Sequence, residues 1–355
     1  MTTMTGGDRQ TRLRTAYRGC LLGGAVGDAL GAPVEFMKLG EIRRRFGPAG
    51  VTGLEESIGR RGTITDDTQM TLFTAEGLIR WENQGEKREV PVSQAVHRAY
   101  LRWLGTQGEL VDVPGRPGWL VGVRGLHARR APGETCLSAL RSGQAGARGS
   151  PLNDSKGCGA VMRVAPVGLA CLEDPFAVGC ELAALTHGHP TGQLAAGAMA
   201  QLVAELVEGA GLHDAVQRVL ARLAVEPEHE ETSRTLGMAV DLARHGRPSA
   251  SAVSSLGRGW VAEEALAIGV FCALAATSFE EGVLLAVNHD GDSDSTGSIA
   301  GNLLGLAFGE ESIPPRFLEE LELLETVTAV AKDLWAHFGA AAPSPRRDLD
   351  RYPSG

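Results

Sequence analysis

Apolar residues recur along most of the chain at a spacing of three to four positions. Three stretches illustrate the pattern: Met70, Leu72, Phe73, Leu78 and Ile79; then Leu194, Met199, Leu202 and Leu206; then Val261, Leu266, Val270, Phe271 and Leu274. This spacing is the period of an α-helix with one buried face. Almost no segment alternates apolar and polar residues with the period of two that a half-buried strand needs. The pattern therefore predicts an all-α protein.

Two segments near opposite ends of the sequence carry glycine at every fourth position. They are Gly19, Gly23, Gly27 and Gly31, and Gly297, Gly301, Gly305 and Gly309. A spacing of four places each set on one face of a helix. Because glycine costs a helix interior about 0.5–1 kcal/mol relative to alanine, eight of them need a compensating contact. Leucine and alanine fill the intervening positions, which favours close helix–helix packing over a series of turns.

Composition limits the class of protein. The chain has 355 residues, of which 43% are hydrophobic and 22% charged, as in globular proteins with a large buried core. The net charge is −9 and no basic run is present, so nucleic acid is not expected as a partner. No run of 18 apolar residues exists, so we expect no membrane span.

The start of the chain and its cysteines favour a cytoplasmic protein. Residues 1–14 are polar and lack the apolar core of a secretion signal. Six cysteines are scattered without a C-x-x-C pair, which is typical of buried thiols in a reducing compartment and excludes a cysteine zinc site. We expect residues 15–340 to form a single domain with flexible termini at 1–14 and 341–355, because no segment resembles a domain linker. We also expect a monomer.

Acidic residues gather in two clusters, each at the expected start of a helix. The first is Thr65-Asp66-Asp67-Thr68, and the second is Asp292-Ser293-Asp294-Ser295 after His289-Asp290-Gly291. Either cluster alone is typical of a helix cap. One cap needs one side-chain oxygen, however, whereas the second cluster places three carboxylates within five residues, which is costly unless a cation neutralises them. Oxygen donors of this kind suit Mg²⁺, Mn²⁺ or Ca²⁺. We prefer a two-metal site shared by both clusters. The spacing of an EF-hand calcium loop is not present at the second cluster.

Five motifs occur together in one order. They are GDALGAPVE (27–35), TDDT (65–68), GCGAVMRVAPVG (157–168), THGHPTG (186–192) and GDSDSTGSIAGNLLG (291–305). In this combination the chain resembles the ADP-ribosylglycohydrolase family from about residue 16 to about residue 310. The resemblance implies a compact orthogonal helical bundle of the ADP-ribosylglycohydrolase type. It also implies two divalent cations, Mg²⁺ or Mn²⁺, at the base of a cleft for ADP-ribose.

The resemblance also implies roles for individual residues. The positions that match metal ligands are Thr65, Asp66, Asp67, Asp292, Asp294 and Ser295. Asp66, Asp67 and Glu35 are the candidate catalytic carboxylates, one of which would act as the general base on water. The positions that match the ADP-ribose cleft are Gly133, Lys156, Gly157, Cys158, Gly159, His187, His189 and Trp260. Which histidine faces the ligand stays open, and Trp260 suits a core position as well as a stacking platform.

The expected activity is hydrolysis of the glycosidic bond between ADP-ribose and an acceptor, with release of ADP-ribose. The GDSDSTG spelling favours ADP-ribosylated arginine on protein; serine-linked or other O-linked ADP-ribose, including O-acetyl-ADP-ribose, is the alternative. A non-catalytic ADP-ribose reader and a two-metal phosphatase are the competing classes. Every metal position keeps an oxygen ligand, which argues against the reader, and a phosphatase would release orthophosphate rather than ADP-ribose.

Overall fold

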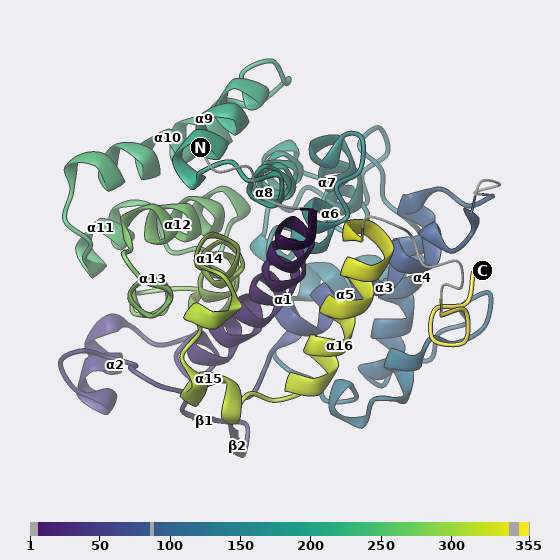
Figure 1. The fold of residues 1–355 in the computed structure, drawn as a ribbon, viewed down its shortest axis with the longest axis horizontal. Coiled ribbons are helices and arrows are strands. Elements are labelled where there is room, and N and C mark those ends of the chain that lie inside the picture. Colours follow the sequence, from purple (N-terminus) through teal and green to yellow (C-terminus); the bar gives the residue numbers. More distant parts are fainter. Residues whose placement is uncertain (1–5, 86–88, 341–347, 355) are drawn as a thin grey trace.

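The computed structural model describes residues 6–85, 89–340 and 348–354, and helices dominate them (Figure 1). Among these residues the only sheet is an antiparallel pair, β1 (Glu56–Ser57) and β2 (Arg60–Arg61). This confirms the all-α prediction. The α-helices are α1 (Gly6–Gly31), α2 (Leu39–Phe46), α3 (Asp66–Glu82), α4 (Val92–Thr106), α5 (Glu134–Arg141), α6 (Ala165–Leu169), α7 (Pro175–Ala184), α8 (Pro190–Glu208), α9 (Leu212–Leu223), α10 (Glu230–His245), α11 (Ala250–Ser255), α12 (Ala262–Ala275), α13 (Phe279–Val287), α14 (Ser293–Phe308), α15 (Pro315–Glu319) and α16 (Leu324–Leu334).

The two glycine-bearing helices, α1 and α14, pack against each other at the centre of the molecule (Figure 1). A Cβ added at Gly19 would lie 2.3 Å from the Gly305 carbonyl oxygen, and one added at Gly23 would lie 2.3 Å from that of Gly301. One added at Gly27 would lie 1.9 Å from the carbonyl oxygen of Gly297. Since the pairs run in opposite order, the helices are antiparallel, and only glycine allows their backbones to come this close.

The last glycine of the second set has a different role. Gly309 lies beyond the end of α14, where its φ of 83° and its N–H bond to the Gly305 carbonyl end the helix. The expectation that it extends the packed face was therefore wrong. At the other end of the contact, a Cβ on Gly31 would lie 2.2 Å from the Ser293 carbonyl oxygen. The antiparallel packing thus places the C-terminal end of α1 directly against the N-terminal end of α14.

Helix α3 is enclosed by other helices. It packs against α1, α4, α6, α14 and α16, and every residue from Asp66 to Arg80 is buried. Such a helix would ordinarily be apolar all round, yet this one holds Glu76 and Arg80 as an ion pair 3.4 Å apart and begins with two aspartates. Because the start of α3 is not exposed to water, the presence of two aspartates there needs another explanation.

Parts of both terminal segments belong to the described residues. Helix α1 begins at Gly6, so the latter part of the expected lead is helical. In the tail, Tyr352 is fully buried and its hydroxyl donates to Asp333 at 2.8 Å. An apolar ring with a hydrogen-bonded hydroxyl anchors this segment, which composition alone did not indicate. Residues 1–5 and 341–347 lie outside the described residues.

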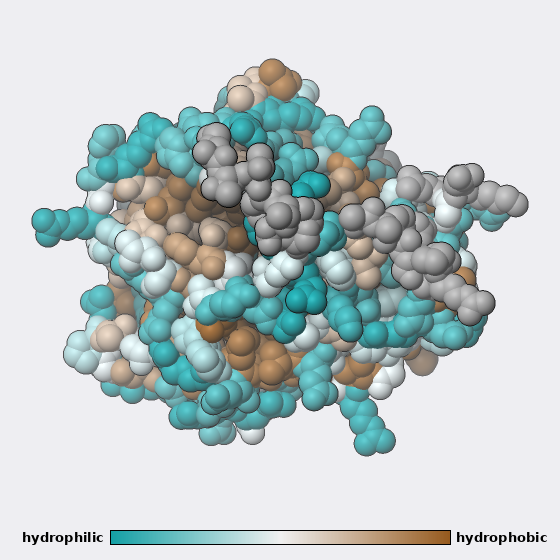
Figure 2. Space-filling model, in the orientation of Figure 1, coloured by the Kyte–Doolittle hydropathy of each residue, from teal (hydrophilic) through white to brown (hydrophobic). Residues whose placement is uncertain are grey.

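The hydropathy of the surface is typical of a folded domain with a buried apolar core. The face in Figure 2 is hydrophilic over most of its periphery, with apolar residues showing in separate areas between. Within the described ranges, no helix combines the length and the apolar character needed to cross a membrane.

Candidate functional site

The N-terminal ends of α3 and α14 open onto one cavity of about 200 Å³. Both acidic clusters therefore reach the same space, although about 225 residues separate them in sequence. Twelve of the predicted site residues line this cavity: Glu35, Asp66, Asp67, Gly133, Gly157, Cys158, Gly159, His187, Trp260, Asp292, Asp294 and Ser295.

The start of α3 is tied to α1 by Asp28. This carboxylate is fully buried and accepts hydrogen bonds from the Thr65 N–H at 3.0 Å and the Thr68 N–H at 3.1 Å, as well as from the Thr68 hydroxyl. Two of the N–H groups at the helix start are thereby satisfied by a side chain from another helix. Thr65 itself caps α3, because its hydroxyl oxygen accepts from the Asp67 N–H at 3.3 Å.

The second cluster forms at the α1–α14 contact. Asp292 caps α14 by accepting from the Ser295 N–H at 3.4 Å, and Asp294 accepts from the same N–H at 3.0 Å. Glu35 follows the C-terminal end of α1, which lies against the start of α14. Ligand oxygens of Glu35, Asp292 and Asp294 consequently all lie within 4.8 Å of one another. The sequence had placed Glu35 among the catalytic carboxylates but outside the metal-ligand set.

Among the described residues, no lysine or arginine lines this acidic cavity. Burial, together with the charges of Asp294 and Asp66, raises the pKa of Glu35 to about 9. Burial and the Asp294 charge likewise raise the pKa of Asp66 and that of Asp67. Asp67 Oδ1 is buried without a hydrogen-bond partner among the described residues. Clustered hard oxygens, one of them unpartnered, are the donor set of a divalent cation such as Mg²⁺ or Mn²⁺, so the residues fit one.

A glycine-bearing segment forms the opposite wall. Cys158 N–H donates to the Trp260 carbonyl at 3.2 Å, and Ala262 N–H donates to the Lys156 carbonyl at 2.9 Å. This pairing holds residues 156–158 beside the segment that leads into α12. Gly159 packs against the His187 ring, where an added Cβ would lie 3.2 Å from Cε1. The small residues keep this wall open and leave backbone close to the cavity.

The two histidines of the THGHPTG motif separate into different positions. His187 is buried and lines the cavity, and its Nδ1 bonds the Thr186 hydroxyl at 2.8 Å. Burial and the nearby Arg163 charge lower its pKa to about 3, so the ring is neutral. His189 instead caps α8, its Nδ1 accepting from the Thr191 N–H at 3.1 Å. His187 therefore lines the cavity, and His189 does not.

Lys156 and Thr65 also lie away from the cavity lining. The Lys156 ammonium bonds Glu231 at 2.7 Å and Glu263 at 2.5 Å, which satisfies it on both sides. These ion pairs connect Lys156 to α10 and α12, which explains a lysine at this position without a contact to a ligand. Thr65 is buried behind Asp67, with its hydroxyl 3.4 Å from Asp67 Oδ2.

Trp260 is a surface residue at the rim of the cavity, not a core residue. Its side chain is 40% exposed and stacks on Phe36, which is 75% exposed, with ring centroids 5.7 Å apart and planes at 17°. Large aromatic side chains this exposed are uncommon on a polar surface. Both belong to a second cavity of about 200 Å³ that Glu35 also lines, so the two cavities adjoin at Glu35 and Trp260.

Comparison with known proteins agrees with this geometry. The family model "ADP-ribosylglycohydrolase" matches residues 9–343. The chain belongs to the ADP-ribosylglycohydrolase family. It is 28% identical to the ADP-ribosyl-[dinitrogen reductase] glycohydrolase of Rhodospirillum rubrum over 86% of this chain and 90% of that protein. It is 23% identical to the ADP-ribosylarginine hydrolase Tri1 of Pseudomonas putida over 90% of this chain and 77% of that protein.

A solved structure shares the fold. An ADP-ribosylglycohydrolase-related protein complex aligns with a TM-score of 0.62 and 25% identity, over 92% of this chain and 99% of that one. The family and these relatives are glycohydrolases, so the chain is a hydrolytic enzyme. The recognition made from five sequence motifs is confirmed.

Several residues that line this cavity were not among those predicted from the sequence. Thr135, Cys136 and Met162 line it, and Asp28 supports it from behind. Asp28 carried a readable signal, because a carboxylate in the middle of an apolar helix must find buried donors. Thr135, Cys136 and Met162 carried none, since a threonine, a cysteine or a methionine suits a core position equally well.

Proposed function

We propose that this enzyme hydrolyses the N-glycosidic bond between ADP-ribose and an arginine side chain of a modified protein, with two divalent cations, Mg²⁺ or Mn²⁺, in the acidic cavity. The observation that carries the proposal is the meeting of two acidic helix starts in one cavity with Asp67 Oδ1 left unpartnered. The names of the relatives from Rhodospirillum rubrum and Pseudomonas putida support the substrate class. Serine-linked or other O-linked ADP-ribose is the alternative substrate.

Thr65, Asp66, Asp67, Asp292, Asp294 and Ser295 would hold the cations, and Glu35, whose oxygens lie with those of Asp292 and Asp294, would join them. Cations bound there would act as Lewis acids: they would orient the ribose hydroxyls and lower the pKa of a bound water. Asp66, Asp67 and Glu35 are the candidates for taking the proton of the attacking water. The reaction would pass through an oxocarbenium-like state, which negatively charged neighbours stabilise.

The other walls would bind the rest of ADP-ribose. Gly157, Cys158 and Gly159 would bring backbone close to the diphosphate, as glycine-rich segments do in phosphate sites. Neutral His187 would offer a hydrogen bond without adding charge. We assign Lys156 and His189 supporting roles, since their polar groups already bond Glu231, Glu263 and the Thr191 N–H.

The second cavity, beside Phe36 and Trp260, would receive the acceptor. Its lining includes Glu35 and Asp290, the stacked aromatic pair, and two cationic side chains, Lys38 and Arg258. A guanidinium would bond Asp290 through its planar fork and stack on the aromatic pair, and these two contacts favour it despite the lysine and arginine of the same lining. A serine hydroxyl would gain neither interaction.

The test compares arginine-linked with serine-linked ADP-ribosyl peptides, in the presence of Mg²⁺, Mn²⁺ or a chelator. We expect release of free ADP-ribose from the arginine peptide with either cation and loss of turnover with the chelator. Asp294→Asn should lower turnover by orders of magnitude while leaving helicity unchanged. Preferred turnover of the serine peptide would overturn the acceptor assignment, and release of orthophosphate would overturn the reaction.

We also infer that residues 15–340 act as one domain. The packing of α1 against α14 and α16, which joins the two ends of the sequence, supports this inference. Limited proteolysis should leave a single resistant core, and separate stable fragments would contradict it.

A further inference from the structure

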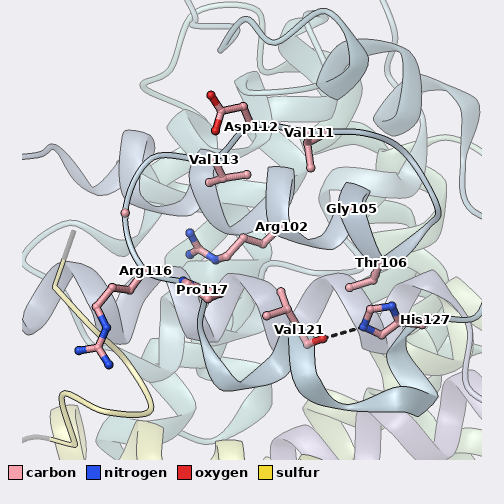
Figure 3. Close-up of a pocket in the computed structure, with 11 residues that line it drawn as sticks. Arg102, Gly105, Thr106, Val111, Asp112, Val113, Arg116, Pro117, Val121 and His127 are labelled. Carbon is pink, nitrogen blue, oxygen red and sulfur yellow. Dashed lines mark hydrogen bonds between the residues drawn. The ribbon is translucent and has the colours of Figure 1, made fainter.

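A larger cavity, of about 350 Å³, lies apart from the catalytic one (Figure 3). It opens between the C-terminal half of α4 and the segment from Val111 to His127. None of the residues that line it lines the catalytic cavity. Its volume falls in the range of ordinary small-molecule sites, and the proposed hydrolysis makes no use of it.

One charged side chain dominates this cavity. Arg102 is 6% exposed, and its Nε donates to Glu76 at 3.3 Å. Its Nη2 is buried and has no hydrogen-bond partner among the residues that the structure describes. Figure 3 shows the side chain extending from α4 into the ring of lining residues, with Val113 and Pro117 on either side of the guanidinium.

The charge of Arg102 is incompletely compensated. Glu76 is fully buried and supplies a single negative charge, which it shares between Arg102 and Arg80. Asp112, the one carboxylate in the cavity lining, is exposed, and its carboxylate is directed away from Arg102 in Figure 3. Leaving a buried guanidinium nitrogen without an acceptor is costly, so an anion that bonds Arg102 Nη2 would be favoured.

The remaining lining selects the kind of anion. Val111, Val113, Pro117 and Val121 form apolar walls, and the His127 ring is already committed through Nε2, which donates to the Val121 carbonyl at 2.7 Å. A guanidinium edge pairs with a planar carboxylate, whereas a phosphate calls for more donors than Arg102 supplies. Arg116, the other arginine of the lining, is exposed, and its guanidinium is directed away from Arg102 in Figure 3. Apolar walls favour an alkyl body.

We propose that this cavity is a second ligand site, which binds a small aliphatic carboxylate with its carboxylate on Arg102 and its alkyl chain against the valines. The loop wall of the site is tied to α3, because Arg80 Nη2 donates to the Arg116 carbonyl at 2.8 Å. Gly118, next to Pro117 of the lining, packs against Glu76, where an added Cβ would lie 1.7 Å from Oε1. The proposal does not depend on the substrate assigned to the catalytic cavity.

The experiment titrates the full chain with hexanoate, and in parallel with inorganic phosphate, by calorimetry and thermal melting. We expect saturable hexanoate binding that excess ADP-ribose does not displace and that phosphate does not reproduce. Arg102→Gln should weaken it by about tenfold or more, the cost of losing a charged hydrogen bond. Arg43→Gln, at an exposed arginine of α2, is the matched control and should bind like the wild type.

Because Arg102→Gln also removes an ion-pair partner of the buried Glu76, Val113→Phe provides an independent test. It fills the cavity from the half-buried loop side without touching the Glu76 ion pairs, and it should also abolish binding. Absence of saturable hexanoate binding by the wild type would overturn the proposal. So would displacement by ADP-ribose, equal binding of phosphate, or unchanged binding by Val113→Phe.

Discussion

Replacing Gly23 by alanine adds one methyl group where α1 touches α14. The new Cβ would lie 2.3 Å from the Gly301 carbonyl oxygen and 3.0 Å from the Phe279 ring. Ordinary van der Waals contact begins at 3.4 Å, so the two backbones would have to separate by about 1 Å. The nearest obstacle is backbone, which cannot rotate away as a flexible side chain can.

The stability change follows from two opposing terms. Alanine favours a helix over glycine by about 0.5–1 kcal/mol. Overpacking costs about 1–3 kcal/mol, and here the neighbouring Gly19 and Gly27 contacts would open as well. We expect a net loss of about 2 kcal/mol in the free energy of unfolding, measured by urea denaturation followed by circular dichroism.

Gly237→Ala is the matched control. Gly237 lies inside α10, and a Cβ added there has nothing within 4 Å. This variant should therefore gain about 0.5–1 kcal/mol. If Gly23→Ala gained stability in the same way, the close packing of α1 and α14 would be refuted. Turnover gives a second readout, because separating these helices moves Glu35 away from Asp292 and should weaken cation binding.

Three further predictions follow from buried or exposed side chains. Burial lowers the pKa of His289 to about 4, so the unfolded chain takes up a proton near pH 6.5 that the folded chain refuses. The contribution of His289 to stability should therefore fall by about 1.5 kcal/mol between pH 6.5 and 5, and urea denaturation should show it as a shrinking stability difference between the wild type and His289→Gln. Asp28→Asn should cost about 1–3 kcal/mol and lower turnover, because its amide would face the donors of α3; unchanged melting and turnover would contradict this. Trp260→Leu should raise KM for the arginine peptide more than it changes kcat, whereas Phe308→Leu, at an equally exposed aromatic, should change neither.

The helices and their central contact were predictable because each depends on a short-range pattern. Periodic leucines predict a buried helix face, and glycines four apart predict a close approach on one face. Gly309 shows where this reasoning stops. Its position continues the spacing, but a helix end depends on φ, and residue spacing does not report φ.

The candidate site was only partly predictable because its members meet through tertiary packing. Glu35 joins Asp292 and Asp294 since antiparallel packing brings the end of α1 to the start of α14, and sequence motifs do not give helix direction. The exposure of Trp260 and the separate positions of His187 and His189 likewise depend on which loops pair. Tyr352 can be buried because Asp333 accepts a hydrogen bond from its hydroxyl. The sequence of the polar tail alone does not indicate this contact with α16.

The sequence left two interpretations of the acidic clusters, helix caps or metal ligands, and the geometry is compatible with both at once. Thr65 and Asp292 each use one side-chain oxygen to cap a helix, which fixes the backbone that follows. The capped helix start then holds the next carboxylates in the cavity, where the positive end of the helix dipole lowers the cost of gathering them. Capping does not satisfy them all, since Asp67 Oδ1 keeps no partner among the described residues. When a helix cap uses only some of the carboxylate oxygens at a helix start, the remaining oxygens are held in place and can bind a cation within an otherwise apolar core.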